Sequence, residues 1–157
     1  MKKTVAYSRS ILSQVMLIDK ANSIGNIHGG EIVKMMDSAA AVVAKKHSRK
    51  AVVTARIDQL EFHTPINVGD LITCTGEIVF VGRSSMEVRL TVEVEKLKIE
   101  AEPKIALMGY FTMVAIDDHG HSVPVPELIL ETPEEIREFE EGKKRYLEYK
   151  KNKSPSK

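Results

Sequence analysis

Hydrophobic and polar residues alternate with a period of two through the middle of the chain, from residue 51 to residue 116. The alternation is cleanest at residues 86–95, where every second side chain is apolar: Met86, Val88, Leu90, Val92 and Val94. Such a period predicts a strand with one buried face. Turn residues divide the region into four predicted strands, at 52–62, 71–81, 86–95 and 104–116, whose spacing favours a meander of long hairpins.

A different pattern, with apolar residues three and four positions apart, predicts a helix at residues 30–46. This segment has no proline, holds three consecutive alanines and ends on Lys45, Lys46 and His47, cations that favour a helix C-terminus. Residues 8–18 predict one more strand. We therefore expect an α+β fold in which a five-stranded antiparallel sheet curls around the helix and buries it on every side.

The C-terminal part predicts an extended connection at 122–132 and a second helix that begins after Thr132 and runs to about Lys151. Thr132, Pro133 and Glu135 are the residues expected at an N-cap and in a first turn. The acidic early half and basic late half of this helix indicate a solvated face. We expect a main domain at 1–125, a helical extension with a basic tail at 126–157, and fraying over 153–157.

One carboxylate interrupts the apolar stripe of the first helix. Asp37 shares a face with Val33, Ala40, Ala41 and Ala44. A carboxylate in apolar surroundings costs several kcal/mol, on the order of the penalties for buried ions, unless it is paired. Asp37 is therefore a candidate functional residue, and the alternative is an Asp at the helix edge that reaches water or a lysine.

Composition and charge narrow the class of protein. The formal net charge of +1 argues against a nucleic-acid partner, because proteins that bind nucleic acids usually carry a strong excess of basic residues. The single cysteine, Cys74, excludes an internal disulfide and is expected in the core. No long apolar run follows Lys2 and Lys3, so we expect no signal peptide, no transmembrane segment, no membrane partner and a cytoplasmic location.

The segment before the first helix is rich in glycine and reads Asn22-Ser-Ile-Gly25-Asn26-Ile-His28-Gly29-Gly30. Together with Asp37, and with the later segments 54–55, 62–66 and 82–87, it resembles the acyl-CoA thioesterases of the hotdog fold over residues 8–116. The similarity is to the cytosolic acyl-CoA hydrolase branch with its small bacterial single-domain members. It implies a thioester hydrolase whose helix is wrapped by the sheet and whose subunits pair, as dimers and as trimers of dimers.

The resemblance also implies functional residues. An Asn in the loop and an Asp in the helix, contributed by opposite subunits, correspond by motif position to Asn26 and Asp37. Coenzyme A is held in such proteins by the strand after the helix and by a Gly-Arg-Ser-Ser turn, which points to five residues here: Thr54, Ala55, Arg83, Ser84 and Ser85. Without the resemblance, Arg83 is equally a solvated turn residue. No cofactor and no metal are implied, because coenzyme A is part of the substrate.

The chemistry of thioester hydrolysis suits these residues. The N–H groups of Gly29 and Gly30, at the helix N-terminus, are expected to stabilise the developing oxyanion. Asp37 either activates water as a general base or attacks the thioester as a nucleophile, and the sequence leaves both open. Asn26 positions water or carbonyl, or serves only as a turn residue. His28 is expected to orient the substrate or pack the loop.

Other functions stay open at this point. A hotdog hydratase or dehydratase would use a His paired with a carboxylate in the helix, whereas His28 precedes the glycines. A non-catalytic acyl-CoA-binding module is the third alternative. The acyl chain needs an apolar tunnel, for which Val33, Met35 and Met36 are candidates, although core packing is the first expectation for all three. His119 and His121 beside Asp117 predict a polar turn rather than a metal site.

Overall fold

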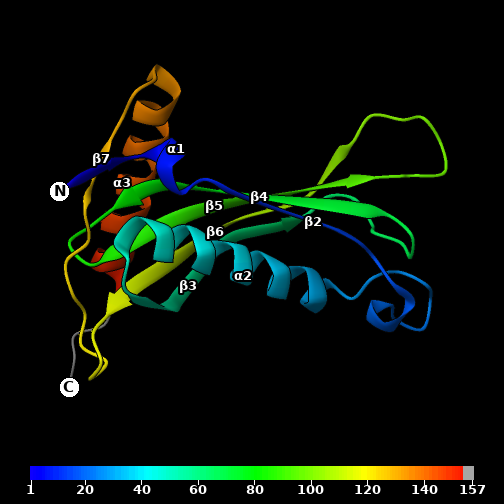
Figure 1. Ribbon diagram of the computed structural model, residues 1–157, viewed down its shortest axis with the longest axis horizontal. Helices are drawn as coiled ribbons and strands as arrows, with labels where there is room; N and C mark the ends of the chain where they lie inside the picture. The colour runs from blue at the N-terminus through cyan, green and yellow to red at the C-terminus, as the bar shows by residue number, and fades with distance from the viewer. Residues whose placement is uncertain (154–157) are drawn as a thin grey trace.

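A computed structural model describes residues 1–153 of the chain (Figure 1). Its main sheet has five antiparallel strands in the order β2-β4-β5-β6-β3: Ser10–Val15 (β2), Ala51–Phe62 (β3), Leu71–Val81 (β4), Ser85–Glu95 (β5) and Lys104–Ile116 (β6). The expected five-stranded sheet and its strand positions are thus confirmed. Residues 154–157 of the expected frayed tail lie outside the described residues.

The strand order differs from the expected meander. Strands β4, β5 and β6 follow one another as hairpins, but β3 pairs with β6 and lies at the edge of the sheet. The periodicity of a strand sets which side chains are buried and carries no information on the neighbouring strand, so the meander of four strands was wrong for β3. As a consequence, the outer edge of β3 has no partner strand within the described part of the chain.

Helix α2, Gly29–Ser48, runs along one face of the sheet and contacts all five strands (Figure 1). The alternating apolar residues of β5 lie beneath it and are almost fully buried, as the sequence pattern predicts. Cys74 belongs to the same core, and burial raises the pKa of its thiol to about 12. The helix is not buried on every side in the single chain, because Lys34, Val42 and Lys45 are exposed.

Helix α3, Pro133–Asn152, packs against the opposite face of the sheet, over β4. Its N-terminus is as expected: the Thr132 hydroxyl accepts a hydrogen bond from the N–H of Glu135 at 3.0 Å. A β-bulge in β4 shifts the register between Ile78 and Phe80. Ile78 therefore packs in the α2 core, whereas the Phe80 ring meets the ring of Phe139 on α3 with centroids 4.9 Å apart.

Four short elements were not predicted from the sequence because each is too short to show a period. The predicted strand at 8–18 contains only β2, flanked by helix α1, Val5–Ser8, and a 3-10 turn, Ile18–Lys20. Strand β1, Lys2–Thr4, pairs in parallel with β7, Glu127–Ile129, inside the expected extended connection. The N-terminal segment and the segment before α3 thus form a separate two-stranded sheet.

His47 fastens this small sheet to the end of α2. It is fully buried, and its Nε2 lies 2.7 Å from the carbonyl oxygen of Pro126, just before β7. Its Nδ1 has no hydrogen-bond partner among the described residues. Burial lowers the pKa of His47, and the nearby Lys3 acts in the same direction. The imidazole is therefore neutral at pH 7, with Nε2 donating to the carbonyl.

We expect His47 to make stability fall in mild acid. Below about pH 6.5 the unfolded chain binds a proton at this residue while the folded chain does not, so the free energy of unfolding decreases toward the lowered native pKa. In His47→Gln, which keeps a donor for Pro126, this part of the loss should vanish. Urea unfolding curves recorded between pH 7 and pH 5 measure this decrease in the free energy of unfolding. His119→Gln, at an exposed turn, is the control that should retain the wild-type pH dependence.

Candidate active site

Asp37 lies in the third turn of α2 at the edge of its apolar stripe, as expected, and is half-buried. The hydroxyl of Thr54, on the exposed edge strand β3, donates a hydrogen bond of 2.6 Å to its Oδ1. Thr54 is paired in register with the buried Met113, so its side chain faces α2. The structure thus places Thr54 with the carboxylate, although the resemblance assigned it to coenzyme A.

The loop before α2 is built around the side chain of Asn22. Its Oδ1 accepts hydrogen bonds from the backbone N–H groups of Ile24 and Asn26, both at 3.1 Å. Gly25 has φ +88°, a left-handed conformation that side chains disfavour, and it lets the loop turn back. These bonds hold the Asn22 side chain with its amide N–H groups available as donors, a feature that the sequence analysis did not single out.

The first residues of α2 present free backbone donors. His28 is the N-cap, is exposed and makes no side-chain capping bond. Its carbonyl accepts the N–H of Glu31, but within residues 1–153 no acceptor is found for the N–H groups of Gly29 and Gly30. A Cβ at Gly30 would meet nothing within 4 Å, whereas one at Gly29 would lie 3.0 Å from the Phe62 ring. Gly30 is therefore the more open of the two predicted oxyanion donors.

A pocket of about 400 Å³ adjoins this helix terminus. Asn22, Asn26 and Gly29 line it together with the exposed ring of Phe62 and with residues 63–66 of the loop after β3. Polar donors on one wall and an apolar ring on another suit a thioester whose carbonyl needs hydrogen bonds and whose acyl group does not.

The predicted oxyanion donors and the predicted base do not meet within one chain. Asp37 follows Gly29 by two full helical turns, which places it about 12 Å farther along the axis at 1.5 Å per residue. A reacting carbonyl must lie within about 3 Å of both a base or nucleophile and its oxyanion donors. If both groups act on one carbonyl, one chain provides two half-sites, one at Asp37 and Thr54 and one at the glycine-rich loop.

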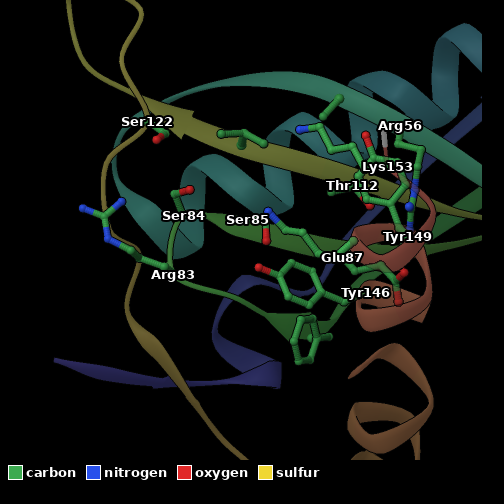
Figure 2. Close-up of a pocket in the computed structure, with 14 residues that line it drawn as sticks. Arg56, Arg83, Ser84, Ser85, Glu87, Thr112, Ser122, Tyr146, Tyr149 and Lys153 are labelled. Atoms are coloured by element: carbon green, nitrogen blue, oxygen red, sulfur yellow. The ribbon is translucent and has the colours of Figure 1, made fainter. Parts of the chain in front are cut away.

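Four of the five residues expected to hold coenzyme A do come together. Ala55, Arg83, Ser84 and Ser85 line a pocket of about 420 Å³ on the α3 side of the sheet (Figure 2). A β-bulge between Thr54 and Arg56 lets Ala55 and Arg56 both line it. Because Thr54 and Ala55 are consecutive, this pocket and the Asp37 half-site adjoin the same point of the edge strand.

Helix α3 forms one wall of this pocket, a role that the sequence alone did not indicate. Tyr146, Tyr149, Lys150 and Lys153 line it. Their spacing of three, four and seven residues puts them on one helical face, and this was the signal available in the sequence. Lys150 and Lys153 are exposed, as the interpretation of this half of the helix as a solvated face predicts, whereas Arg145 is half-buried and departs from it.

A buried ion pair fixes α3 to the sheet. Arg145 contacts both carboxylate oxygens of Glu87 on β5, at 2.7–3.1 Å, and its guanidinium lies 3.8 Å from the centroid of the Tyr110 ring. Burial raises the pKa of Glu87, and the bonds from Arg145 oppose that shift. Gly142 lets the helix approach closely, since a Cβ there would lie 2.7 Å from the Cβ of Phe80.

The tunnel candidates on α2 divide between core and surface. Met36 is fully buried, as core packing predicts. Val33 and Met35 are half-buried, and Met35 lines a groove of about 380 Å³ with the apolar side chains of Leu12, Met16, Ile32 and Ile72. Met35 therefore stays a candidate for contact with an acyl chain, whereas Met36 does not.

The His119 region forms the expected polar turn. Asp117 Oδ1 accepts the backbone N–H groups of His119 and His121, both at 2.9 Å. Within the described residues no group of three or more His, Cys, Asp or Glu side chains is arranged to hold a metal ion. A search of the same residues finds no helix that is long and apolar enough to span a bilayer.

The sequence and the fold were compared with known proteins. A sequence profile of the thioesterase superfamily matches residues 24–101. The human cytosolic acyl coenzyme A thioester hydrolase is 37% identical over 148 residues, which cover 94% of this chain and 39% of the human protein. The chain thus spans about two fifths of the length of that relative.

Two solved structures show the same fold. An apo-hexameric acyl-CoA thioesterase superposes with a TM-score of 0.90 at 36% identity, over 96% of this chain and 97% of that chain. The acyl-CoA hydrolase of Staphylococcus aureus, solved with butyryl coenzyme A, coenzyme A and coenzyme A disulfide, has a TM-score of 0.83 at 28% identity, over 96% of each chain. The expected hotdog fold is confirmed. Because a relative at 36% identity matches nearly the whole length of both proteins, this chain belongs to the thioesterase superfamily, among the acyl-CoA thioester hydrolases.

Proposed function

We propose that the protein hydrolyses acyl-CoA thioesters to a free carboxylic acid and coenzyme A. The observation that carries the proposal is the Asp37 carboxylate, half-exposed and oriented by the Thr54 hydroxyl at 2.6 Å on an open sheet edge. The names of the relatives support it, since they are acyl-CoA thioester hydrolases and one is solved with butyryl coenzyme A.

The residues suggest a short reaction. Asp37 takes a proton from water that attacks the thioester carbon, or attacks that carbon itself and is released by water. The carbonyl oxygen becomes negative and accepts hydrogen bonds from Gly29 and Gly30. The carbon–sulfur bond then breaks, and because a thiol ionises near pH 8.5, the thiolate leaves without a strong acid. Ala55, Arg83, Ser84 and Ser85 bind the coenzyme A part.

A complete site requires two copies of the chain. The distance along α2 separates the base of one chain from its own oxyanion donors, so the donors come from a partner. The open edge of β3 and the exposed side of α2 provide an apolar surface for pairing, with Val42 39%, Val53 45% and Ile57 41% exposed. Two solved relatives are described as hexameric, which supports assembly as a trimer of dimers.

The staphylococcal hydrolase adds a second loop residue to the proposal. Structures of that enzyme exist for separate alanine variants of one asparagine, one aspartate and one threonine. Its aspartate lies 15 residues after the asparagine and 17 residues before the threonine. The same spacings join Asn22, Asp37 and Thr54 here. We therefore propose Asn22, whose amide donors are held in the pocket, alongside the predicted Asn26.

The variant Asn22→Asp distinguishes the proposed role of Asn22 from that of Asn26. The aspartate keeps an acceptor for the N–H groups of Ile24 and Asn26 but loses the amide donors. If Asn22 binds the thioester carbonyl, kcat should fall about 10²-fold, the usual effect of one lost oxyanion donor, with an unchanged melting temperature. Asn26→Asp is the matched variant. A large loss in Asn26→Asp alone would return the role to Asn26.

The function itself is tested by release of free thiol from acyl-CoA thioesters of two to eighteen carbons. Turnover of at least one chain length, well above the rate of spontaneous hydrolysis, is the expected result. Tight acyl-CoA binding without thiol release would instead favour the binding module, and hydration of an enoyl-CoA, followed by absorbance, would favour the hydratase. The relatives named cytosolic support a cytoplasmic location, which fractionation of the source cells tests.

A further inference from the structure

The α3 wall of the larger pocket carries positive charge that the described residues leave uncompensated. Five charged side chains line this pocket: Arg56, Arg83, Glu87, Lys150 and Lys153. Glu87 forms an ion pair with Arg145, a residue that does not line the pocket. Arg56 is paired with Asp58 at 2.8 Å. Within residues 1–153 no carboxylate lies within ion-pair distance of the other three cations, so the pocket favours an anion with several charges.

Flat groups stand beside these cations. The Arg56 guanidinium lies 3.7 Å from the centroid of the Tyr149 ring. The Tyr146 ring packs between Phe80, at a centroid distance of 5.2 Å, and Gly82, where a Cβ would be 3.3 Å from the ring. Figure 2 shows both tyrosines facing the cavity from α3, with Ser84 and Ser85 on the opposite side. Aromatic and guanidinium planes bind purine bases by stacking.

Anions, planar bases and hydroxyl groups occur together in a nucleotide. A pocket of about 420 Å³ falls in the range of small-molecule sites. The serine and threonine hydroxyl groups on its walls, those of Ser84, Ser85, Thr112 and Ser122, are suited to a ribose and to phosphate oxygens. Coenzyme A carries such a group, a 3′-phosphorylated adenosine diphosphate, at the end remote from its thiol.

We propose that α3 recognises this nucleotide and thereby makes the enzyme selective for coenzyme A thioesters over thioesters of pantetheine, which lack the nucleotide and are the form that carrier proteins present. Lys150 and Lys153 bind the phosphates, and Tyr149, with Arg56 on its ring, contacts the base. The inference rests on the proposed function, because it names what distinguishes substrates at the same site.

The attachment of α3 fits this role. Lys150, near the end of α3, and Lys153, the first residue after it, follow Arg145 by five and eight residues, so the Glu87–Arg145 pair fixes the helix shortly before them. The contact of Gly142 with Phe80 sets the distance between helix and sheet. The helix is therefore held against the sheet by buried contacts, and the two lysines, which are exposed, extend from its C-terminal end.

The test compares two double variants of the full-length protein. Lys150→Ala with Lys153→Ala removes two charges from the pocket. Lys143→Ala with Lys144→Ala removes two charges from an exposed part of the same helix and is the control. Kinetics are measured with butyryl coenzyme A and with S-butyryl-pantetheine. For the pocket variant we expect KM for butyryl coenzyme A to rise about tenfold or more, with kcat retained and the pantetheine ester unaffected.

Binding of adenosine 3′,5′-bisphosphate, measured by calorimetry, gives a readout independent of turnover. The wild type and the control should bind it with equal affinity, and the pocket variant about tenfold or more weakly. Equal effects of the two double variants, or a wild type that does not prefer the coenzyme A ester, would overturn the inference. A wild type that hydrolyses neither ester refutes the proposed function, and the bisphosphate titration then still decides whether α3 binds the nucleotide.

Discussion

Asp37→Asn is expected to lower kcat/KM for acyl-CoA by about 10³-fold or more while leaving the fold intact. A general base or nucleophile must be basic, and the neutral amide oxygen is far less basic than a carboxylate; positioned proton transfer alone contributes about 10²–10⁴-fold. The substitution is nearly isosteric and keeps an oxygen for the Thr54 hydroxyl, so the local hydrogen bond of 2.6 Å can persist. Thiol release measures the loss, and thermal unfolding checks the fold.

Two comparison variants sharpen this prediction. Thr54→Val keeps the shape of the side chain but removes the donor, so Asp37 loses its orientation and activity should fall less than in Asp37→Asn. Asp19→Asn, at a carboxylate in the short turn after β2, changes the net charge equally and should leave turnover unchanged. Activity within a few-fold of wild type in Asp37→Asn and in Asp37→Ala would remove Asp37 from the mechanism.

Two inactive variants are expected to restore activity when their chains are combined. If each site takes Asp37 from one subunit and the loop from the other, a mixed dimer of Asp37→Ala and Asn22→Asp has one site with both residues intact. Random pairing of equal amounts makes half of the dimers mixed, so about a quarter of wild-type activity should return. Chains refolded together from denaturant, or produced together in one cell, provide the mixture.

The amount recovered distinguishes the two arrangements of the site. A site formed within one chain predicts no recovery at any mixing ratio, because every chain then lacks one residue. Pairs of the same variant, treated identically, are the control for refolding. Recovery that follows the product of the two chain fractions, with a maximum at equal amounts, is the signature of a shared site. The helix geometry requires this outcome if Asp37 and the Gly30 N–H act on one carbonyl.

The elements that could be predicted from sequence are those in which a buried face repeats over many residues. The β5 pattern and the α2 stripe each place several side chains against one core, so local periodicity determines their conformation. The β3–β6 pairing was missed because strand neighbours depend on how the whole sheet closes. Strands β1 and β7 have three residues each, and each is paired only with the other.

The site was predicted in part for the same reason. Asp37 stood out because a charge broke an apolar stripe, whereas Asn22 looked like any other loop asparagine until its Oδ1 was seen to hold the turn. The pairing of Thr54 with Asp37 crosses 17 residues and depends on the register of β3. The α3 wall was missed because its charges matched a solvated helix, and only the docking on Phe80 and Glu87 shows which face lies against the sheet.

The bulge in β4 has a consequence for how this protein can vary. Ile78 before it belongs to the α2 core, and Phe80 after it belongs to the contact with α3. One strand therefore serves two separately packed layers, divided at a single inserted residue. Substitutions on the α3 side can change the shape of the pocket that α3 lines without altering the volume that α2 must fill. Substrate selectivity can thus diverge among such chains while the central helix and its carboxylate stay in place.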